Sequence, residues 1–132
     1  SYLETNVKEN NSSVKPVMAD ALEICKTFAD GELDLIVSNP PYIKSADIET
    51  LQKEVRLEPR LALDGGEDGC DFYREIVSRW SRKLKKGGAL AFELGENQAD
   101  AVKALMTDKG FSDFKISLDF GGVQRAIIGT LL

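Results

Sequence analysis

The clearest hydrophobic pattern in the chain is a short, nearly continuous apolar run over residues 33–38, followed at once by Asn39-Pro40-Pro41-Tyr42. A short β-branched run bounded by breaking residues is typical of a strand buried on both faces within a parallel sheet. Proline fixes φ and has no N–H, so the strand must end where the prolines begin. The pattern predicts a central strand over 33–38 that ends in a stiff turn, the NPPY turn (residues 39–42).

The rest of the chain alternates between helical and strand patterns. Residues 71–84 have the spacing of an amphipathic helix, and the following Lys-Lys-Gly-Gly at 85–88 is typical of a helix C-terminus. A short apolar run at 14–18 contains Pro16, which places this predicted strand near the rim of a sheet. The other expected elements are helices over 2–10, 22–28 and 97–109, and strands over 89–94, 114–118 and 125–132.

The order of these elements predicts an α/β fold. The last two strands are joined by a few residues around Gly121 and Gly122. They must be antiparallel, because a parallel link needs a crossover of about a dozen residues or more. The long segment 43–69 has weak periodicity and many turn residues, and such a segment in a compact domain is usually functional or disordered. We therefore expect an α/β sheet that ends in an antiparallel hairpin.

Composition and charge narrow the classes of function. The chain has 132 residues, the size of one domain, and its net charge of −5 argues against broad attraction to nucleic acid. Histidine is absent, which excludes His-based triads and His-ligated metal sites, and no metal site is expected. No apolar run approaches about 20 residues, so no membrane span is expected. The amino-terminal residues lack a secretory pattern, and Cys25 and Cys70 are typical of free thiols in a cytoplasmic protein.

The NPPY turn has the chemistry to hold a planar –NH₂ group. Such a group has two donors, and the Asn39 side-chain oxygen and the Pro40 carbonyl can accept both. Tyr42 can supply a flat face beside them. Because ligands of open α/β sheets bind at the carboxyl ends of strands, the turn is expected at the site of chemistry. The alternatives are a rigid turn without further function, or a proline-rich ligand for another domain.

Several segments together give the chain a resemblance to a known family. They are the NPPY turn, Val-Arg-Leu-Glu-Pro at 55–59, Gly-Gly-Glu-Asp-Gly at 65–69, Asp-Phe-Tyr-Arg at 71–74, Leu-Lys-Lys-Gly-Gly at 84–88, Phe-Glu-Leu-Gly at 92–95 with Gln98, and residues 119–125. With them the chain resembles the class I S-adenosylmethionine-dependent methyltransferases, and within these the HemK/PrmC family, which methylates a glutamine of peptide chain release factors. The resemblance implies a Rossmann-like sheet, S-adenosyl-L-methionine as cofactor and a release factor as protein substrate.

The resemblance also implies roles for individual residues. Asn39 and Pro40 would be the catalytic pair that holds the glutamine amide, with Pro41 and Tyr42 completing the substrate-binding turn. Asp20 would contact the cofactor's adenine, and Asn39 would also border the cofactor. For Asp20, a helix cap is an alternative.

Other positions in the matching segments are more ambiguous. Glu58 would lie near the substrate entrance, with a surface turn as the alternative. Gly65, Gly66 and Gly69 lack the lysine and the preceding strand of a phosphate-binding loop, so we expect flexible turns there. Glu93, at a strand end, is either structural or part of the pocket.

The chain matches only part of the family's architecture, and residues 1–132 are interpreted as the carboxyl-terminal part of its catalytic domain. The first strand with its glycine-rich turn and the second strand are not found in this sequence. In the family's strand order, 3-2-1-4-5-7-6, the predicted strand 14–18 would then have no neighbour and 33–38 would form an exposed apolar edge. We therefore expect this chain alone to be inactive, and either to self-associate through that edge or to pair the predicted strand 14–18 in a non-native way.

Two further functions remain open. An adenine N6 methyltransferase of DNA or RNA shares the NPPY turn, although the negative charge and the lack of basic loops disfavour nucleic acid as direct substrate. A non-catalytic fragment or binding module would account for the missing glycine-rich turn. Methyl transfer to nucleic acid rather than to a release factor would favour the first of these alternatives.

Overall fold

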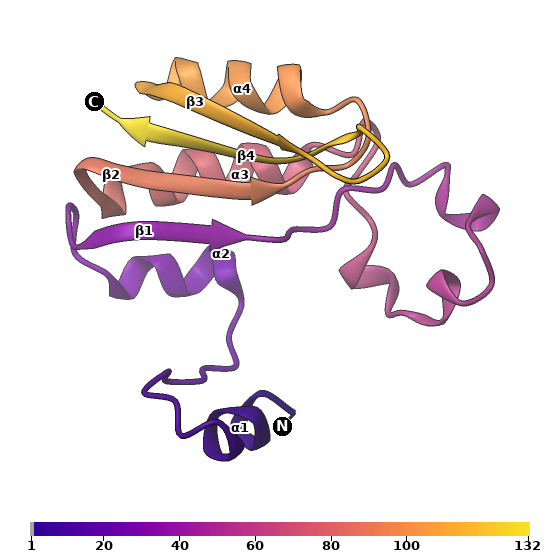
Figure 1. The fold of residues 1–132 in the computed structure, drawn as a ribbon, viewed down its shortest axis with the longest axis horizontal. Helices are drawn as coiled ribbons and strands as arrows, with labels where there is room; N and C mark the ends of the chain where they lie inside the picture. Colours follow the sequence, from indigo (N-terminus) through magenta and orange to yellow (C-terminus); the bar gives the residue numbers. More distant parts are fainter. Residues whose placement is uncertain (1) are drawn as a thin grey trace.

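A four-stranded mixed sheet forms the centre of the protein, whose computed structural model describes residues 2–132 (Figure 1). The strands are β1 (Leu33–Ser38), β2 (Leu84–Glu93), β3 (Phe111–Leu118) and β4 (Gln124–Leu131), in the order β1-β2-β4-β3. β1 is parallel to β2, whereas β4 is antiparallel to both β2 and β3. The predicted α/β sheet with a closing antiparallel hairpin is therefore confirmed.

The helices pack on one face of this sheet. They are α2 (Ala21–Ile24), α3 (Asp71–Trp80) and α4 (Ala99–Asp108), and α3 contacts both of the others. Tyr73 and Val77 of α3 are buried against Leu90 and Phe92 of β2, and the rings of Tyr73 and Phe92 meet edge to face at 5.2 Å. This packing follows from the apolar stripe of α3, because burying one face of a helix is what stabilises it in a domain.

β2 begins earlier than expected, and this corrects the assignment of residues 85–88. α3 ends at Trp80, a single 3₁₀ turn covers Ser81–Lys83, and the Lys-Lys-Gly-Gly segment lies within β2 instead of ending a helix. The reason is long-range pairing with β1, in which Leu33 is paired with Leu84 and Leu35 with Ala89. Gly88 fits there because it approaches β1 closely: a Cβ would lie 3.1 Å from the Asp34 carbonyl oxygen.

The predicted strand at 14–18 is wrong: the structure has no regular secondary structure and no strand pairing in this segment. Val17 and Met18 are exposed, and none of the four strands lies beside them. A strand persists only when a neighbour satisfies its backbone groups. The expected exposed edge is confirmed, since β1 is the outer strand and Leu35 and Val37 are 54% and 69% exposed. Self-association through this edge stays a prediction.

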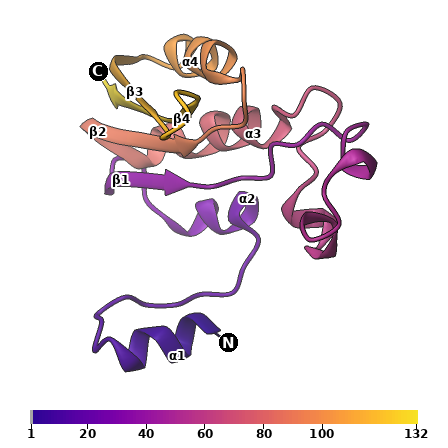
Figure 2. The same ribbon diagram turned by 45° about the vertical axis from the view of Figure 1, so that its right-hand side comes forward.

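The amino-terminal part of the chain makes few contacts with the rest. α1 (Tyr2–Glu9) has no buried residue and stands apart from the sheet in both ribbon views (Figures 1 and 2). α2 and the 3₁₀ turn Cys25–Thr27 dock more firmly, as Trp80 Nε1 donates to the Ala21 carbonyl at 3.0 Å and its ring lies 5.4 Å from that of Phe28. The first tight attachment of the chain is thus at α2.

The structure bears on two further expectations. Cys25 and Cys70 are both buried free thiols, as predicted. None of the helices in residues 2–132 has the length and hydrophobicity needed to span a membrane.

Candidate active site

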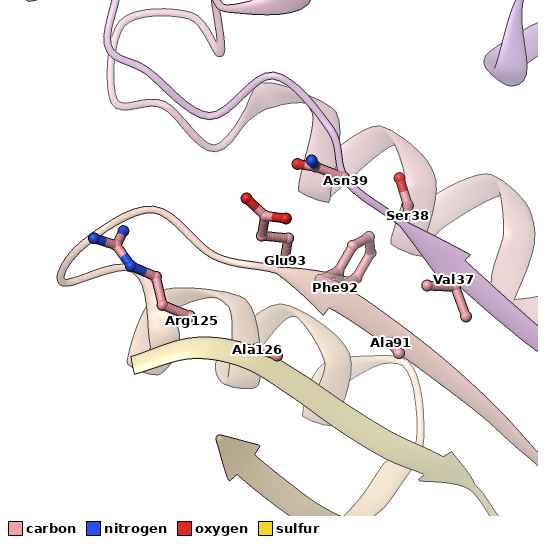
Figure 3. A pocket seen from close by; sticks show the side chains of 8 residues that line it. All are labelled: Val37, Ser38, Asn39, Ala91, Phe92, Glu93, Arg125 and Ala126. Carbon is pink, nitrogen blue, oxygen red and sulfur yellow. The ribbon is translucent and has the colours of Figure 1, made fainter. Parts of the chain in front are cut away.

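The candidate site lies where β1 and β2 end, beside the start of β4. Ser38 is paired with Phe92, so Asn39 follows β1 at the level where Glu93 ends β2. Glu93 is in turn paired with Ala126, which brings Arg125 to the same place. Figure 3 shows Asn39, Glu93 and Arg125 around one cavity. The pairing of β2 with both β1 and β4 thus puts three polar side chains at the edge of the sheet that the carboxyl ends of β1 and β2 form.

Two cavities meet at this edge. The first, of about 460 Å³, lies on the sheet and has a mostly apolar wall; it is lined by Val37, Ser38, Asn39, Ala91, Phe92, Glu93, Arg125 and Ala126. The second, of about 420 Å³, lies between the sheet and the long loop; it is lined by Asn39, Pro40, Tyr42, Ile43, Val55, Glu58, Ala62, Leu63 and Glu93. Asn39 and Glu93 border both, so these two residues stand between the cavities.

The structure brings most of the predicted site residues together. Asn39, Pro40, Tyr42 and Glu58 line the second cavity, while Pro41 does not line either cavity. Pro40 is buried and Asn39 is exposed. Within residues 2–132, the side-chain amide of Asn39 has no hydrogen-bond partner. Its oxygen is therefore available to an incoming donor.

Tyr42 is fixed against the end of β2. Its hydroxyl donates to Glu93 Oε1 at 3.1 Å. Burial, followed by the Glu93 charge, raises the pKa of Tyr42. The phenol therefore keeps its proton at neutral pH and goes on donating to Glu93. Tyr42 thus forms a rigid aromatic wall of the second cavity.

Asp20 lies away from this edge and lines neither cavity. Its Oδ1 accepts from the Leu22 N–H at 2.8 Å, which makes Asp20 the N-cap of α2. The structure thus shows the capping role that was the alternative for this residue. Its contact with a cofactor stays a prediction.

The glycines after the long loop are needed for close packing, which corrects the expectation of flexible turns. At Gly65, a Cβ would lie 2.8 Å from the Tyr42 Cα, and at Gly69 it would lie 2.5 Å from the Tyr42 carbonyl oxygen. Gly69 also has a φ of +77°, a conformation that favours glycine. Both glycines are buried, so this segment packs closely against the Tyr42 backbone.

Sequence reasoning missed the site roles of Arg125 and Gln98. Arg125 lines the first cavity, and its Nε donates to Asp119 Oδ2 at 2.9 Å across the hairpin. Gln98 is buried, and its Nε2 donates to the Tyr42 carbonyl at 2.9 Å. A glutamine at the start of an amphipathic helix, three residues after Gly95, was the available signal, since a polar side chain that is buried there must find hydrogen-bond partners.

Comparisons with known proteins place this geometry in a wider context. No family model matches the chain. It is 50% identical over 105 residues to a release factor glutamine methyltransferase of Geobacter sulfurreducens, covering 79% of this chain and 37% of that protein. It is 40% identical over 128 residues to the enzyme of that name from Clostridium acetobutylicum, covering 96% of this chain and 42% of that protein. The chain thus spans less than half of these curated relatives.

Solved structures agree with the sequence matches. A methyltransferase of Pyrococcus furiosus superposes with a TM-score of 0.69 at 23% identity, covering 98% of this chain and 55% of that one, and shows the fold. The release factor-specific protein-(glutamine-N5) methyltransferase of Alicyclobacillus acidocaldarius superposes with a TM-score of 0.51 at 27% identity, covering 83% of this chain and 54% of that one. The expected class I methyltransferase fold is thereby confirmed.

Proposed function

We propose, on the premise that this chain is homologous to one segment of the release factor glutamine methyltransferases, that its NPPY turn holds the glutamine amide of a release factor for methylation. The observation that carries the proposal is the place of Asn39. Its unpaired amide borders both cavities at the carboxyl end of β1. A group at that boundary can meet a substrate on one side and a methyl donor on the other.

The second cavity suits a primary amide. Asn39 Oδ1 and the Pro40 carbonyl would accept the two N–H bonds of the glutamine –NH₂ group, and the Tyr42 ring would lie along its plane. Pro41 stiffens the turn, because each proline fixes its own φ. Glu58 lies on the loop side of the same cavity, where a protein substrate would enter. A pre-shaped turn of this kind lowers the barrier mainly by orientation.

The first cavity fits the expected methyl donor, S-adenosyl-L-methionine. Apolar Val37, Ala91 and Phe92 line it, and the Glu93 carboxylate would attract a cationic sulfonium centre, because the charge of the nearby Arg125 is already paired with Asp119. When bound, this donor supplies an electrophilic methyl group. Asn39 and the Pro40 carbonyl would hold the glutamine nitrogen in line with that methyl group, and the N–H proton that the nitrogen gives up on methylation would pass to solvent, while the donor would leave as a neutral thioether. Asp20 lines neither cavity, so the contact with adenine that the resemblance assigns to it would require the donor to extend beyond the first cavity towards the start of α2.

The partner we propose is a release factor, so the activity would belong to the cytoplasm, where release factors act. The chain's similarity to curated release factor methyltransferases supports this substrate class. Whether residues 1–132 suffice for turnover is a separate question, and we expect binding of the release factor without efficient methyl transfer. Titration of S-adenosyl-L-methionine into the chain, followed by the heat of binding, measures how much of the donor site is present.

Release factor binding tests the proposal. We expect Asn39→Ala to weaken the affinity of the chain for a purified release factor by roughly tenfold, because two amide donors lose one acceptor. Asn10→Ala is the matched control, since Asn10 bonds only within its own helix end, to the Asn6 carbonyl. Equal affinities of the two variants would contradict the proposal. Labelled methyl transfer to DNA or RNA, and not to the release factor, would replace it with the adenine methyltransferase alternative.

A further inference from the structure

We propose that Gln98 is a positioning residue, whose buried amide holds the Tyr42 backbone and thereby sets where the NPPY turn lies relative to the end of β2. Gln98 immediately precedes α4 and is 8% exposed. In its relevance to catalysis, this inference rests on the proposed role of the turn as a substrate clamp. The evidence for the contact itself is independent of that role.

The Gln98 side chain uses both of its polar atoms, each with two partners. Nε2 donates to the carbonyl oxygens of Tyr42 at 2.9 Å and Gly69 at 3.3 Å. Oε1 accepts from the Gly95 N–H at 2.9 Å and lies 3.2 Å from the Tyr73 hydroxyl. The orientation of the amide is unambiguous, because two carbonyls can only accept and the Gly95 N–H can only donate.

Tyr73 links this amide to β2. Its hydroxyl lies 2.8 Å from the Glu93 carbonyl and 3.2 Å from Gln98 Oε1, so its one hydrogen is shared between two acceptors. Tyr73 is fully buried in α3, and that burial raises its pKa, so the hydroxyl stays protonated and continues to donate. Helix α3, the end of β2 and the NPPY turn are thus joined through two side chains.

Three glycines allow the backbone to pack closely around Gln98 and Tyr42. A Cβ at Gly69 would lie 2.7 Å from Gln98 Nε2, and one at Gly95 would lie 2.5 Å from Gln98 Oε1 and 2.9 Å from the Tyr42 ring. A Cβ at Gly65 would lie 2.8 Å from the Tyr42 Cα. The Gln98 amide therefore sits in a close-packed seat, where a displaced group has nowhere to relax.

The position of Tyr42 is transmitted to Asn39 by the two prolines between them. The Tyr42 carbonyl faces Gln98, while the Tyr42 hydroxyl bonds Glu93 at the cavity. Pro40 and Pro41 each have a fixed φ, so the short link has few torsions that could absorb a displacement. Freeing the Tyr42 carbonyl should therefore move Asn39, and small displacements at a reacting centre have large effects on orientation.

Gln98→Glu separates the two halves of the network. Glutamate keeps the length of the side chain and acceptors for Gly95 and Tyr73, but the ionised form cannot donate to Tyr42 and Gly69. Gln98→Met is the second variant; it removes the same donors without burying a charge. Gln52→Glu, at an exposed position in the long loop, is the matched control.

Amide hydrogen exchange measures the positioning directly. We expect exchange at Ile43 and Gly65, whose N–H groups donate to Leu63 and Ile43 carbonyls, to rise roughly tenfold more than exchange of the β2 amides in both Gln98 variants. Gln52→Glu should leave this ratio unchanged. An equal rise at the turn and in β2 would overturn the proposal, because it would mean that Gln98 only stabilises the fold.

Release factor affinity, measured on the same variants, links the position to function. Both Gln98 variants should bind the release factor roughly tenfold more weakly than the unaltered chain under conditions where all are folded. Unchanged affinity with raised exchange would overturn the link to the substrate. If the unaltered chain does not bind the release factor, the proposed function fails, while the exchange ratio still decides whether Gln98 holds the turn.

Discussion

The long loop has a root beside the sheet and a tip in solvent, and hydrogen bonds and burial hold the root more firmly than the tip. The root comprises residues 39–43 and 64–70. The Ile43 N–H donates to the Leu63 carbonyl at 3.0 Å and the Gly65 N–H donates to the Ile43 carbonyl at 2.8 Å, so the outgoing and returning segments of the loop are joined there. At its tip (residues 48–62), the backbone hydrogen bonds of the three 3₁₀ turns are all local, and the turns are linked further by the surface ion pairs of Arg60 with Glu49 and Asp64. Leu57 and Leu61 of the tip are 79% and 80% exposed. The loop is rigid where it meets the sheet and loosely held where it meets solvent.

The difference shows which part of the loop has a fixed position and which part can change shape. The root carries Asn39, whose position relative to Glu93 decides what the two cavities can hold. Of these two, the tip borders only the second cavity, through Val55, Glu58 and Ala62. Segments that rely on local hydrogen bonds and little burial open at low free-energy cost. The tip can thus change shape without disturbing the NPPY turn.

Of the substitutions considered, Gly69→Ala in the root should lower the free energy of unfolding most. We expect the free energy of unfolding to fall by about 3 kcal/mol, because a Cβ meets the Tyr42 carbonyl and the φ of +77° is strained for alanine. Gly122→Ala is the control, since Gly122 has a φ of +80° with open space around it, and it should cost about 1 kcal/mol. Urea unfolding measures both; equal losses would show that packing at Gly69 is unimportant.

Leu63→Ala should loosen the junction of root and tip. Leu63 is buried and lies between the two regions, so we expect a loss of about 2 kcal/mol in the free energy of unfolding. Leu61→Ala makes the same chemical change at an exposed position and should stay within about 0.5 kcal/mol. A similar loss at both positions would remove the distinction between root and tip.

Acid should weaken the root through Asp68. Its hydrogen bonds from Arg74 and the Cys70 N–H lower the pKa of Asp68 from 3.8 to about 2. Since the folded pKa lies below the unfolded one, the ion pair stabilises the fold above about pH 4. That stabilisation is lost as the pH falls towards 2.

Asp68→Asn should flatten the dependence of stability on pH between these values, as measured by thermal unfolding at each pH. Arg74→Gln should flatten the same window, because it removes the guanidinium that lowers the pKa of Asp68. A wild-type slope in both variants would refute a role for this pair in anchoring the root.

Leu57→Ser should have the smallest effect on the fold. Leu57 is exposed at the tip, so the free energy of unfolding should change by less than about 0.5 kcal/mol. If the tip receives the release factor, the affinity of the chain for that protein should still fall, by roughly threefold. Unaltered affinity would restrict the substrate contact to the root.

Local patterns were enough to predict the elements that carry the site. β1 and its end at Asn39 could be predicted because proline terminates a strand regardless of the surrounding fold. The closing hairpin could be predicted because two strands with a short link have one possible orientation. The grouping of Asn39, Pro40, Tyr42 and Glu58 at one cavity agrees with the family resemblance, although their chemical roles stay predictions.

What could not be predicted depends on distant partners. Gly87 and Gly88 look like a helix end in isolation, and only pairing with β1 makes them part of β2. Likewise, a glycine that permits a turn and one that permits close approach, as Gly69 does, are identical in the sequence. The segment at 14–18 has strand composition but no strand beside it.

The docking of α2 on α3 gives the chain an optical signal of its own. Trp80 is the single tryptophan, and its indole sits between the Ala21 carbonyl and the Phe28 ring. Indole emission shifts to longer wavelength on contact with water, so the fluorescence reports whether α2 remains attached. A red shift that precedes the loss of circular dichroism during urea titration would mean that the segment from α1 to Phe28 detaches first. The sheet and its NPPY turn could then be studied, at that urea concentration, with the segment from α1 to Phe28 detached from them.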